Sequence, residues 1–402
     1  MNLRQIKAIP WHFQLIVIFY AVHTSVPVIG FYTPAAVNAL VLLFLYGFLF
    51  AKRRKLLITD ILYILPIFSI YILSFLYEGI SHLPTYLYGM SQIFIYPLLA
   101  LYLLRSGDQK SIRRIFLIIG ISYMITGLTT YIGCQIFPSA SRDLAAMLNS
   151  ENPRLYAMYM KYNIGSFSFI YTLVLISPLL IYMIRDKRIN HMIGFICSAI
   201  IVMTILASEY TTALLFLVIC LITFFLPKYF GYKEVIGIIV GAMIFYIAGK
   251  HFLGQIFESL ANIINSEAVS DRLYNLAAFF IGGTQHVSGD VESRINIYNL
   301  SINAFWSSPV WGSSYAKVGG HSYILDSLGR YGLLGFIATV IMYKRLFNGF
   351  FKPWKKQKWY GYVCLLFIVA LAFAVLNPKD NLVVLTFIVP LFTASYKEKL
   401  QL

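Results

Sequence analysis

Apolar stretches long enough to cross a bilayer recur along this chain from Trp11 almost to the C-terminus. A helix needs about 20 apolar residues to span the hydrocarbon core of a membrane. Of the 402 residues, 59% are hydrophobic and 12% are charged, whereas a soluble domain carries roughly 25% charged residues. The pattern excludes a water-soluble globule and a disordered chain, and it indicates a polytopic membrane protein.

We predict an all-α polytopic membrane protein with about twelve transmembrane helices. The first stretch is too long for the apolar region of a signal peptide, so we expect it to stay as a signal anchor. The predicted spans cover residues 11–30, 33–51, 57–76, 86–104, 115–134, 166–184, 192–208, 213–226, 234–249, 332–347, 359–376 and 382–395.

The distribution of charge predicts which ends of these spans face the cytoplasm. An even number of spans places both termini on one side, and 23 of the 32 Lys and Arg residues fall in the loops on that side. Only 5 of the 16 Asp and Glu residues do so. Because Lys and Arg accumulate in cytoplasmic loops, we expect both termini in the cytoplasm. The net charge of +16 is then a topology signal, and it does not call for a nucleic acid.

Two of the predicted outer loops are long, at about 135–165 and about 250–331. Long loops in compact proteins are usually functional or disordered, and the second is too aromatic for disorder. We therefore divide the chain into residues 1–249, with nine spans and the shorter outer loop, residues 250–331, which form a large extracytoplasmic loop, and residues 332–402, with three spans. This organisation places the chemistry in the large outer loop.

The segment 292–336 combines an arginine and a histidine next to the predicted membrane surface. Arg294 belongs to a stretch of helical apolar spacing over 293–306, and His321 begins a second one over 321–328. We expect both to form short helices on the outer membrane surface or capping the bundle. Arginine binds phosphate oxygens bidentately, and histidine can accept a proton near neutral pH. These residue types suit an anionic lipid headgroup.

The same segment resembles the O-antigen ligase and Wzy-type polysaccharide polymerase superfamily of bacterial envelope glycosyltransferases. The family pattern is an outer-loop Arg, an aromatic-rich helix, a Pro-x-x-Gly turn, a His usually followed by Asn, and a Gly-x-x-Gly entry to the next span. The chain departs from it at Ser322, where Asn is usual, and at Arg330, close to where many members have an acidic residue. The residues that match are Arg294, Pro309, Gly312, His321, Gly332 and Gly335.

Two further arginines fit a spacing that some polymerase members carry in each of two outer loops. In that spacing, ten residues separate an arginine from a glycine, as they do between Arg154 and Gly165 and between Arg272 and Gly283. The resemblance makes Arg154 and Arg272 candidate ligands of a pyrophosphate. A structural alternative is that each pairs with a neighbouring carboxylate.

The resemblance implies a GT-C-like glycosyltransferase on the outer face of a bacterial cytoplasmic membrane. Its donor would be an oligosaccharide repeat unit on undecaprenyl pyrophosphate, and a flippase and a chain-length regulator of the same pathway would be its partners. Arg294 would neutralise the leaving pyrophosphate, and His321 would activate the acceptor hydroxyl. The outer loops hold no Asp-x-Asp motif, so we expect neither a metal nor another cofactor.

We interpret the chain as a polysaccharide polymerase, with three alternatives open. An O-antigen ligase would transfer the glycan to a terminal acceptor, a flippase or transporter would move the lipid-linked oligosaccharide, and an assembly scaffold would catalyse nothing. Transporters of polar solutes keep ionisable residues inside their spans, whereas these spans hold His23 and little else of that kind. We expect His23 to be a hydrogen-bonded interhelical residue.

Several charged residues also have purely structural interpretations. The neighbours Arg142 and Asp143 are expected to form a solvated pair. Asp326 and Arg330 lie four apart on a predicted helix, which favours an ion pair between them over the alternative that Asp326 is the carboxylate that orients His321. The four cysteines fall in or beside spans and form no C-x-x-C pair, so we expect them to be unpaired apolar residues.

Overall fold

The computed structural model describes residues 8–51, 83–147, 152–227, 229–263, 270–271, 273–274, 277–278, 281, 290–312, 318–350, 357–377 and 383–396. Every regular element within these ranges is a helix, and none of them contains a strand. The all-α fold class predicted from the sequence is therefore confirmed.

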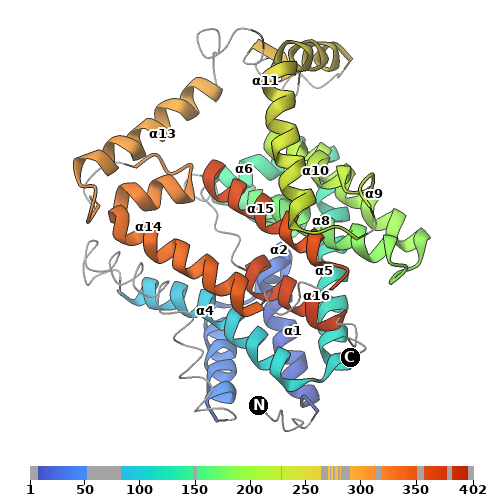
Figure 1. The fold of residues 1–402 in the computed structure, drawn as a ribbon. Coiled ribbons are helices and arrows are strands. Elements are labelled where there is room, and N and C mark those ends of the chain that lie inside the picture. The colour runs from blue at the N-terminus through green and yellow to red at the C-terminus, as the bar shows by residue number, and fades with distance from the viewer. Residues whose placement is uncertain are drawn as a thin grey trace.

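The helices pack around a central pair, α8 and α15, with α13 and α14 to one side (Figure 1). Tyr171 of α8 meets Phe373 of α15 edge-on at 4.4 Å between ring centroids, and Tyr182 meets Tyr362 at 5.5 Å. The elements are α1 (Trp11–Ser25), α2 (Pro27–Tyr32), a helix over Ala35–Ala51, α4 (Leu83–Ser106), α5 (Gln109–Ile136), α6 (Ala140–Met147), α7 (Pro153–Lys161), α8 (Phe167–Arg185), α9 (His191–Ala207), α10 (Thr211–Ile222), α11 (Tyr232–Ile263), α13 (Asp290–Ser307), α14 (Tyr323–Phe350), α15 (Tyr360–Leu376), the π-helical turn η4 (Val384–Ile388) and α16 (Val389–Ser395).

Two helices in the described ranges, α5 and α8, are long and apolar enough to cross a membrane. Shorter apolar helical segments occur over Ala35–Ala51, Phe94–Ser106, His191–Ala207, Thr212–Ile222, Tyr360–Leu376 and Val384–Ser395. The predicted span 57–76 lies outside the described residues. The number of twelve spans stays a prediction.

Three predicted boundaries differ from the observed helices. The predicted span 11–30 is two helices, because Pro27 has no backbone N–H and the residue before it takes an extended conformation (φ −109°, ψ 107°). Helix α11 continues to Ile263 instead of ending near residue 249. The expected short helix at 321–328 and the expected span at 332–347 are one helix, α14, with a kink at Gly332.

The two described chain ends lie at the same end of the bundle, together with the α4–α5 and α8–α9 turns. The backbone N–H of Ile9 donates to the Asp108 carboxylate at 3.1 Å, and Gln109 Nε2 donates to the Ser395 carbonyl at 3.1 Å. The Arg188 guanidinium lies 6.0 Å from the centre of the Tyr396 ring. We call this the basic end.

The segments that the sequence assigns to outer loops gather at the opposite end, here called the loop end. The Val28 N–H donates to Asn163 Oδ1 at 3.2 Å, which joins the α1–α2 break to the segment after α7. The Tyr323 N–H donates to the Asn377 carbonyl at 2.9 Å, which joins the start of α14 to the end of α15.

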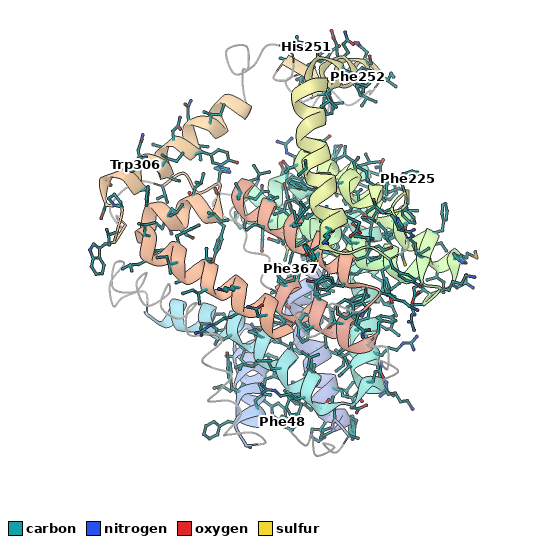
Figure 2. All side chains as sticks on the ribbon, in the orientation of Figure 1. Phe48, Phe225, His251, Phe252, Trp306 and Phe367 are labelled. Carbon is teal, nitrogen blue, oxygen red and sulfur yellow. The ribbon has the colours of Figure 1, made fainter. Side chains whose placement is uncertain are left out.

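The outside of the bundle is apolar. Along α5, Ile121, Ile125 and Ile132 are 59%, 56% and 48% exposed. Phe225 and Trp306 also project from the surface (Figure 2). Many buried hydroxyls, in contrast, bond to backbone carbonyls inside the bundle. The exterior of these helices is therefore no more polar than their interior.

Candidate functional site

The described residues of the segment 292–336 fold as one unit in which α13 packs against the first part of α14 (Figure 1). We call it the His321 unit and define it as α13, the turn 308–312, the loop 318–322 and α14 up to residue 336. Helix α13 contains the helix expected over 293–306. The Tyr298 hydroxyl donates to the Leu376 carbonyl at 3.0 Å, so the unit is attached to the loop end of α15.

Two glycines with positive φ join the turn to α14. Gly312 has φ +79° and Gly332 has φ +59°, a region that side chains other than glycine rarely adopt. A Cβ on Gly332 would lie 2.5 Å from the Val310 carbonyl oxygen and 2.6 Å from the Gly312 nitrogen. The Leu333 N–H, which the kink removes from the helix, donates to the Pro309 carbonyl at 2.8 Å. The Pro-x-x-Gly turn thus completes the hydrogen bonding of the kinked helix.

The Asp326 carboxylate closes the loop that carries His321. Oδ1 accepts from Ser301 Oγ at 2.6 Å and from the Gly320 N–H at 3.2 Å. Oδ2 accepts from the Ser322 N–H at 3.1 Å. The two residues that flank His321 are therefore tied to one carboxylate, which sits near a helix N-terminus where negative charge is favourable. We call this arrangement the Asp326 clasp.

The Asp326 clasp corrects the expectation of an ion pair between Asp326 and Arg330. Both side chains lie in described residues, and no ion pair joins them. The carboxylate bonds instead to Ser301, 25 positions earlier in the chain. An ion pair between residues i and i+4 on a helix contributes less stabilising free energy than three hydrogen bonds to one carboxylate.

Ser322 caps α14, since its Oγ accepts from the Leu325 N–H at 3.1 Å. Serine and asparagine are preferred about equally at the start of a helix because both side chains accept a hydrogen bond there. An asparagine at position 322 would therefore be able to cap the helix in the same way.

His321 lies exposed on this closed loop, between Gly320 (φ +75°) and Ser322. Ser301 Oγ also accepts from the Gly319 N–H at 2.9 Å, so α13 and the loop share one hydrogen-bond network. An imidazole presented in this way is open to a substrate while its backbone is fixed. The geometry suits a proton acceptor at a site entered from the loop end.

The structure places the backbone of Arg294 in the first turns of α13, within the His321 unit. Its side chain lies outside what the structure describes, and so does the whole of Arg272. The pyrophosphate-binding roles of both residues stay predictions.

Arg154 lies exposed in the first turn of α7 at the loop end. Helix α7 begins with Asn152, whose side chain accepts from the Leu155 N–H at 3.2 Å, and it packs against α2 and α6. None of the contacts within the described ranges joins Arg154 to His321. Its role in the same site stays a prediction.

The expected pair of Arg142 with Asp143 is wrong. Arg142 Nη1 lies 3.8 Å from Glu209 Oε2, across the turn between α9 and α10. Asp143 accepts instead from Ser139 Oγ at 2.7 Å and from the Tyr159 hydroxyl at 3.2 Å. Burial and the Asp143 carboxylate raise the pKa of Tyr159 above its ordinary value.

The hydrogen bond expected of His23 is not found at its Nδ1, which is buried without a partner among the described residues. The ring stacks near Phe19, with 6.0 Å between the ring centroids. All four cysteines are free, as the sequence predicted. Within the described ranges no three His, Cys, Asp or Glu side chains gather closely enough to hold a metal ion.

Asp326 is the residue of this site whose hydrogen-bond partners the sequence interpretation missed. Its partners are one distant serine and two backbone amides, which a residue pattern does not display. The available signal was an acidic residue in the first turn after a capping serine, an arrangement in which side chains bond back to the start of a helix. Comparisons with protein-family models and with curated proteins find no match to this chain.

Proposed function

We propose that this chain is a membrane glycosyltransferase that polymerises oligosaccharide repeat units carried on a polyprenyl pyrophosphate. The observation that carries the proposal is the His321 unit, in which the motif residues of segment 292–336 fold together and present an exposed histidine on a fixed loop. The fold we propose is GT-C-like with about twelve spans, and the site would lie on the outer face of a bacterial cytoplasmic membrane.

The surface of the bundle supports the membrane location. Soluble monomers rarely expose contiguous apolar patches larger than a few hundred Å², whereas α5 exposes several isoleucines along its length. The basic end gathers Lys110, Arg113, Lys187 and Arg188, as expected of a cytoplasmic face. The His321 unit lies at the opposite end, which would then face outward.

In the proposed reaction, the acceptor hydroxyl oxygen bonds to the anomeric carbon of the donor sugar. The bond between that carbon and the pyrophosphate oxygen breaks, and the electron pair leaves with the polyprenyl pyrophosphate. His321 accepts the proton of the acceptor hydroxyl. Arg294, with Arg272 and Arg154, would stabilise the negative charge on the leaving group. Arginine is suited to this because its planar fork binds two phosphate oxygens at once.

The experiment that tests the proposal uses the purified full-length chain and a synthetic polyprenyl-pyrophosphate repeat unit, with product length read by gel or mass spectrometry. The wild-type protein should lengthen the glycan in the presence of EDTA. His321→Ala and Arg294→Ala should abolish lengthening while both proteins still insert in the membrane. Full activity of either variant would remove that residue from the mechanism.

The same preparation distinguishes the alternatives. A ligase would leave the repeat unit unextended until a terminal acceptor is added, and a flippase would move the lipid-linked glycan across a vesicle membrane without changing it. Deleting the gene separates the first two in cells, since loss of a polymerase leaves single repeats whereas loss of a ligase leaves finished polymer on the carrier lipid. Either result would replace the polymerase assignment.

A further inference from the structure

An open cavity of about 570 Å³ lies at the basic end, far along the bundle from the His321 unit. Its charged lining consists of Lys110 and Arg113 from the first turns of α5 and Lys187 and Arg188 from the α8–α9 turn. Among the described residues, no carboxylate belongs to the lining. Positive charges around one cavity repel one another, and an anion bound there would lower that repulsion.

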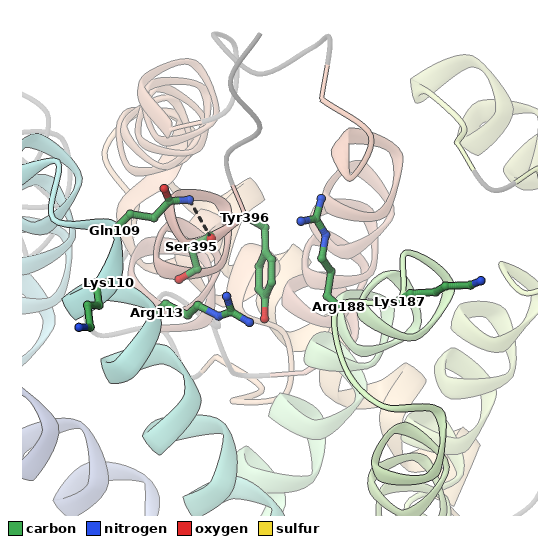
Figure 3. A pocket seen from close by; sticks show the side chains of 7 residues that line it. All are labelled: Gln109, Lys110, Arg113, Lys187, Arg188, Ser395 and Tyr396. Carbon is green, nitrogen blue, oxygen red and sulfur yellow. Dashed lines mark hydrogen bonds between the residues drawn. The ribbon is translucent and has the colours of Figure 1, made fainter. Parts of the chain in front are cut away.

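The floor of the cavity is fixed by the end of α16. Gln109 Nε2 donates to the Ser395 carbonyl at 3.1 Å, which joins α5 to α16 (Figure 3). Tyr396 is 3% exposed, and its hydroxyl is buried without a hydrogen-bond partner among the described residues. The Arg113 and Arg188 guanidinium groups lie on either side of the Tyr396 ring, at 5.8 and 6.0 Å from its centre.

Asp186, which is not one of the described lining residues, orients Arg188. Its Oδ2 accepts from Arg188 Nε at 2.6 Å, and its carboxylate also accepts from the hydroxyls of Tyr182 and Tyr229 at 3.1 Å each. This bond neutralises one of the four positive charges and sets the direction of one guanidinium. Lys110, Arg113 and Lys187 carry the remaining positive charge of the lining.

We propose that this cavity binds a phosphate group. The Arg113 and Arg188 guanidinium groups flank the Tyr396 ring, and the lysines Lys110 and Lys187 lie next to them in the lining. Such groups suit the several oxygens of a phosphate, and basic pockets between membrane helices bind the headgroups of anionic lipids. The phosphate could belong to a lipid of the adjacent leaflet or to a soluble molecule, and both present the same chemistry. The lipid source rests on the membrane location proposed above, whereas the phosphate chemistry does not.

The test measures binding to the purified full-length chain in neutral detergent. One arm titrates short-chain phosphatidylglycerol, with phosphatidylcholine of the same chain length as the comparison, and the other titrates glycerol 1-phosphate. The variant is Lys110→Gln with Arg113→Gln, and the control is Lys161→Gln with Lys233→Gln, which removes two exposed charges outside the cavity. Thermal unfolding of both proteins checks that they fold.

We expect phosphatidylglycerol to bind more tightly than phosphatidylcholine, and the Lys110 and Arg113 variant to bind it about 20-fold more weakly than the wild type. That corresponds to about five-fold per cation, the scale of one basic residue near an anionic surface. The control should bind as the wild type does. Equal binding of glycerol 1-phosphate would support a soluble ligand.

Failure to bind either phosphate probe, or equal binding by the cavity variant and the control, would overturn the proposal. If the variant does not fold, Lys187→Gln replaces it, since Lys187 is exposed. The measurement is binding and not glycan transfer, so its result is independent of whether the His321 unit polymerises a glycan.

Discussion

Asp326 is the single residue on which the order of the His321 loop most depends. Replacing it with asparagine preserves size but puts an amide N–H₂ or a neutral oxygen where two backbone N–H groups and one hydroxyl now donate. We expect Asp326→Asn to lower glycan transfer by about 100-fold, the scale of a misplacement of about 1 Å at a reacting group. The measurement is the rate of glycan lengthening by the purified protein.

Asp326 is a positioning residue, so its test includes a readout that general instability would not move. Asp326→Asn should make the peptide bonds around residue 320 more sensitive to protease, and Asp326→Glu should restore part of the rate. Asp143→Asn is the matched control, because that carboxylate also accepts two side-chain hydrogen bonds at the loop end. Unchanged transfer and protease resistance in Asp326→Asn would refute the role of the clasp.

A second carboxylate, Asp108, predicts how stability depends on pH. Partial burial opposes its ionisation, but hydrogen bonds from Ser111 and from the Ile9 N–H, together with the Arg114 charge, hold the pKa of Asp108 below its ordinary value. Its stabilisation is therefore present above about pH 4, the pKa of an aspartate in an unfolded chain, and is lost as the pH falls through the lower folded value. Thermal unfolding in detergent should show Asp108→Asn less stable than the wild type at pH 6. The difference should vanish near pH 2, and a constant difference would contradict it.

The residue scale also shows a limit of sequence interpretation. Ser301 and Asp326 are 25 positions apart, and Arg142 and Glu209 are separated by three helices. Near neighbours in the chain were the natural partners to predict for Asp326 and Arg142. The fold brings closer partners from elsewhere, and only three-dimensional packing identifies them.

At the scale of elements, the kink of α14 is built by glycine and not by proline. Gly332→Ala would force a side chain into a positive-φ conformation and against the Val310 carbonyl. We expect a loss of at least about 1–3 kcal/mol of stability from the backbone conformation alone. Thermal unfolding would measure the loss.

Gly120→Ala is the control for this variant. Gly120 lies within α5, and a Cβ added there would meet nothing within 4 Å. Alanine is about 0.5–1 kcal/mol better than glycine inside a helix, so this change should leave stability equal or higher. If Gly120→Ala and Gly332→Ala changed the stability equally, the backbone at the Gly332 kink would not be in tight contact with the turn 308–312.

The sequence predicted the presence of most helices but not how they join. Apolar runs locate the helices because burial or lipid contact requires them. They do not reveal that α11 continues through Lys250 and His251 to Ile263, because this extension is amphipathic and not the continuous apolar run that marks a span. Nor do they show that α13 and the start of α14 pack together, since that contact depends on glycines that approach backbone.

At the scale of the whole molecule, the even number of predicted spans and the distribution of Lys and Arg predicted that both termini lie on one side. Ile9 and Ser395 both lie at the basic end. Which side of the membrane that end faces stays a prediction. After replacement of the four native cysteines, Trp306→Cys should react with a membrane-impermeant maleimide added to intact cells, and Lys187→Cys should react only after the cells are opened.

Both positions suit this measurement because Trp306 is 69% exposed and Lys187 lies exposed in a turn. A membrane-permeant maleimide should label both variants in intact cells and so confirms that each cysteine is reactive. The reverse labelling pattern would invert the proposed topology and place the His321 unit in the cytoplasm.

The direct backbone contact between Gly312 and the kink at Gly332 means that the loop with His321 is attached to α14 and does not move independently of that helix. If α14 crosses the bilayer, its tilt responds to the thickness of the surrounding hydrocarbon. Every change of that tilt would then shift the imidazole relative to the headgroups. Turnover would be tuned by acyl-chain length, with an optimum in lipids whose thickness holds the reacting oxygen and the imidazole at the same depth.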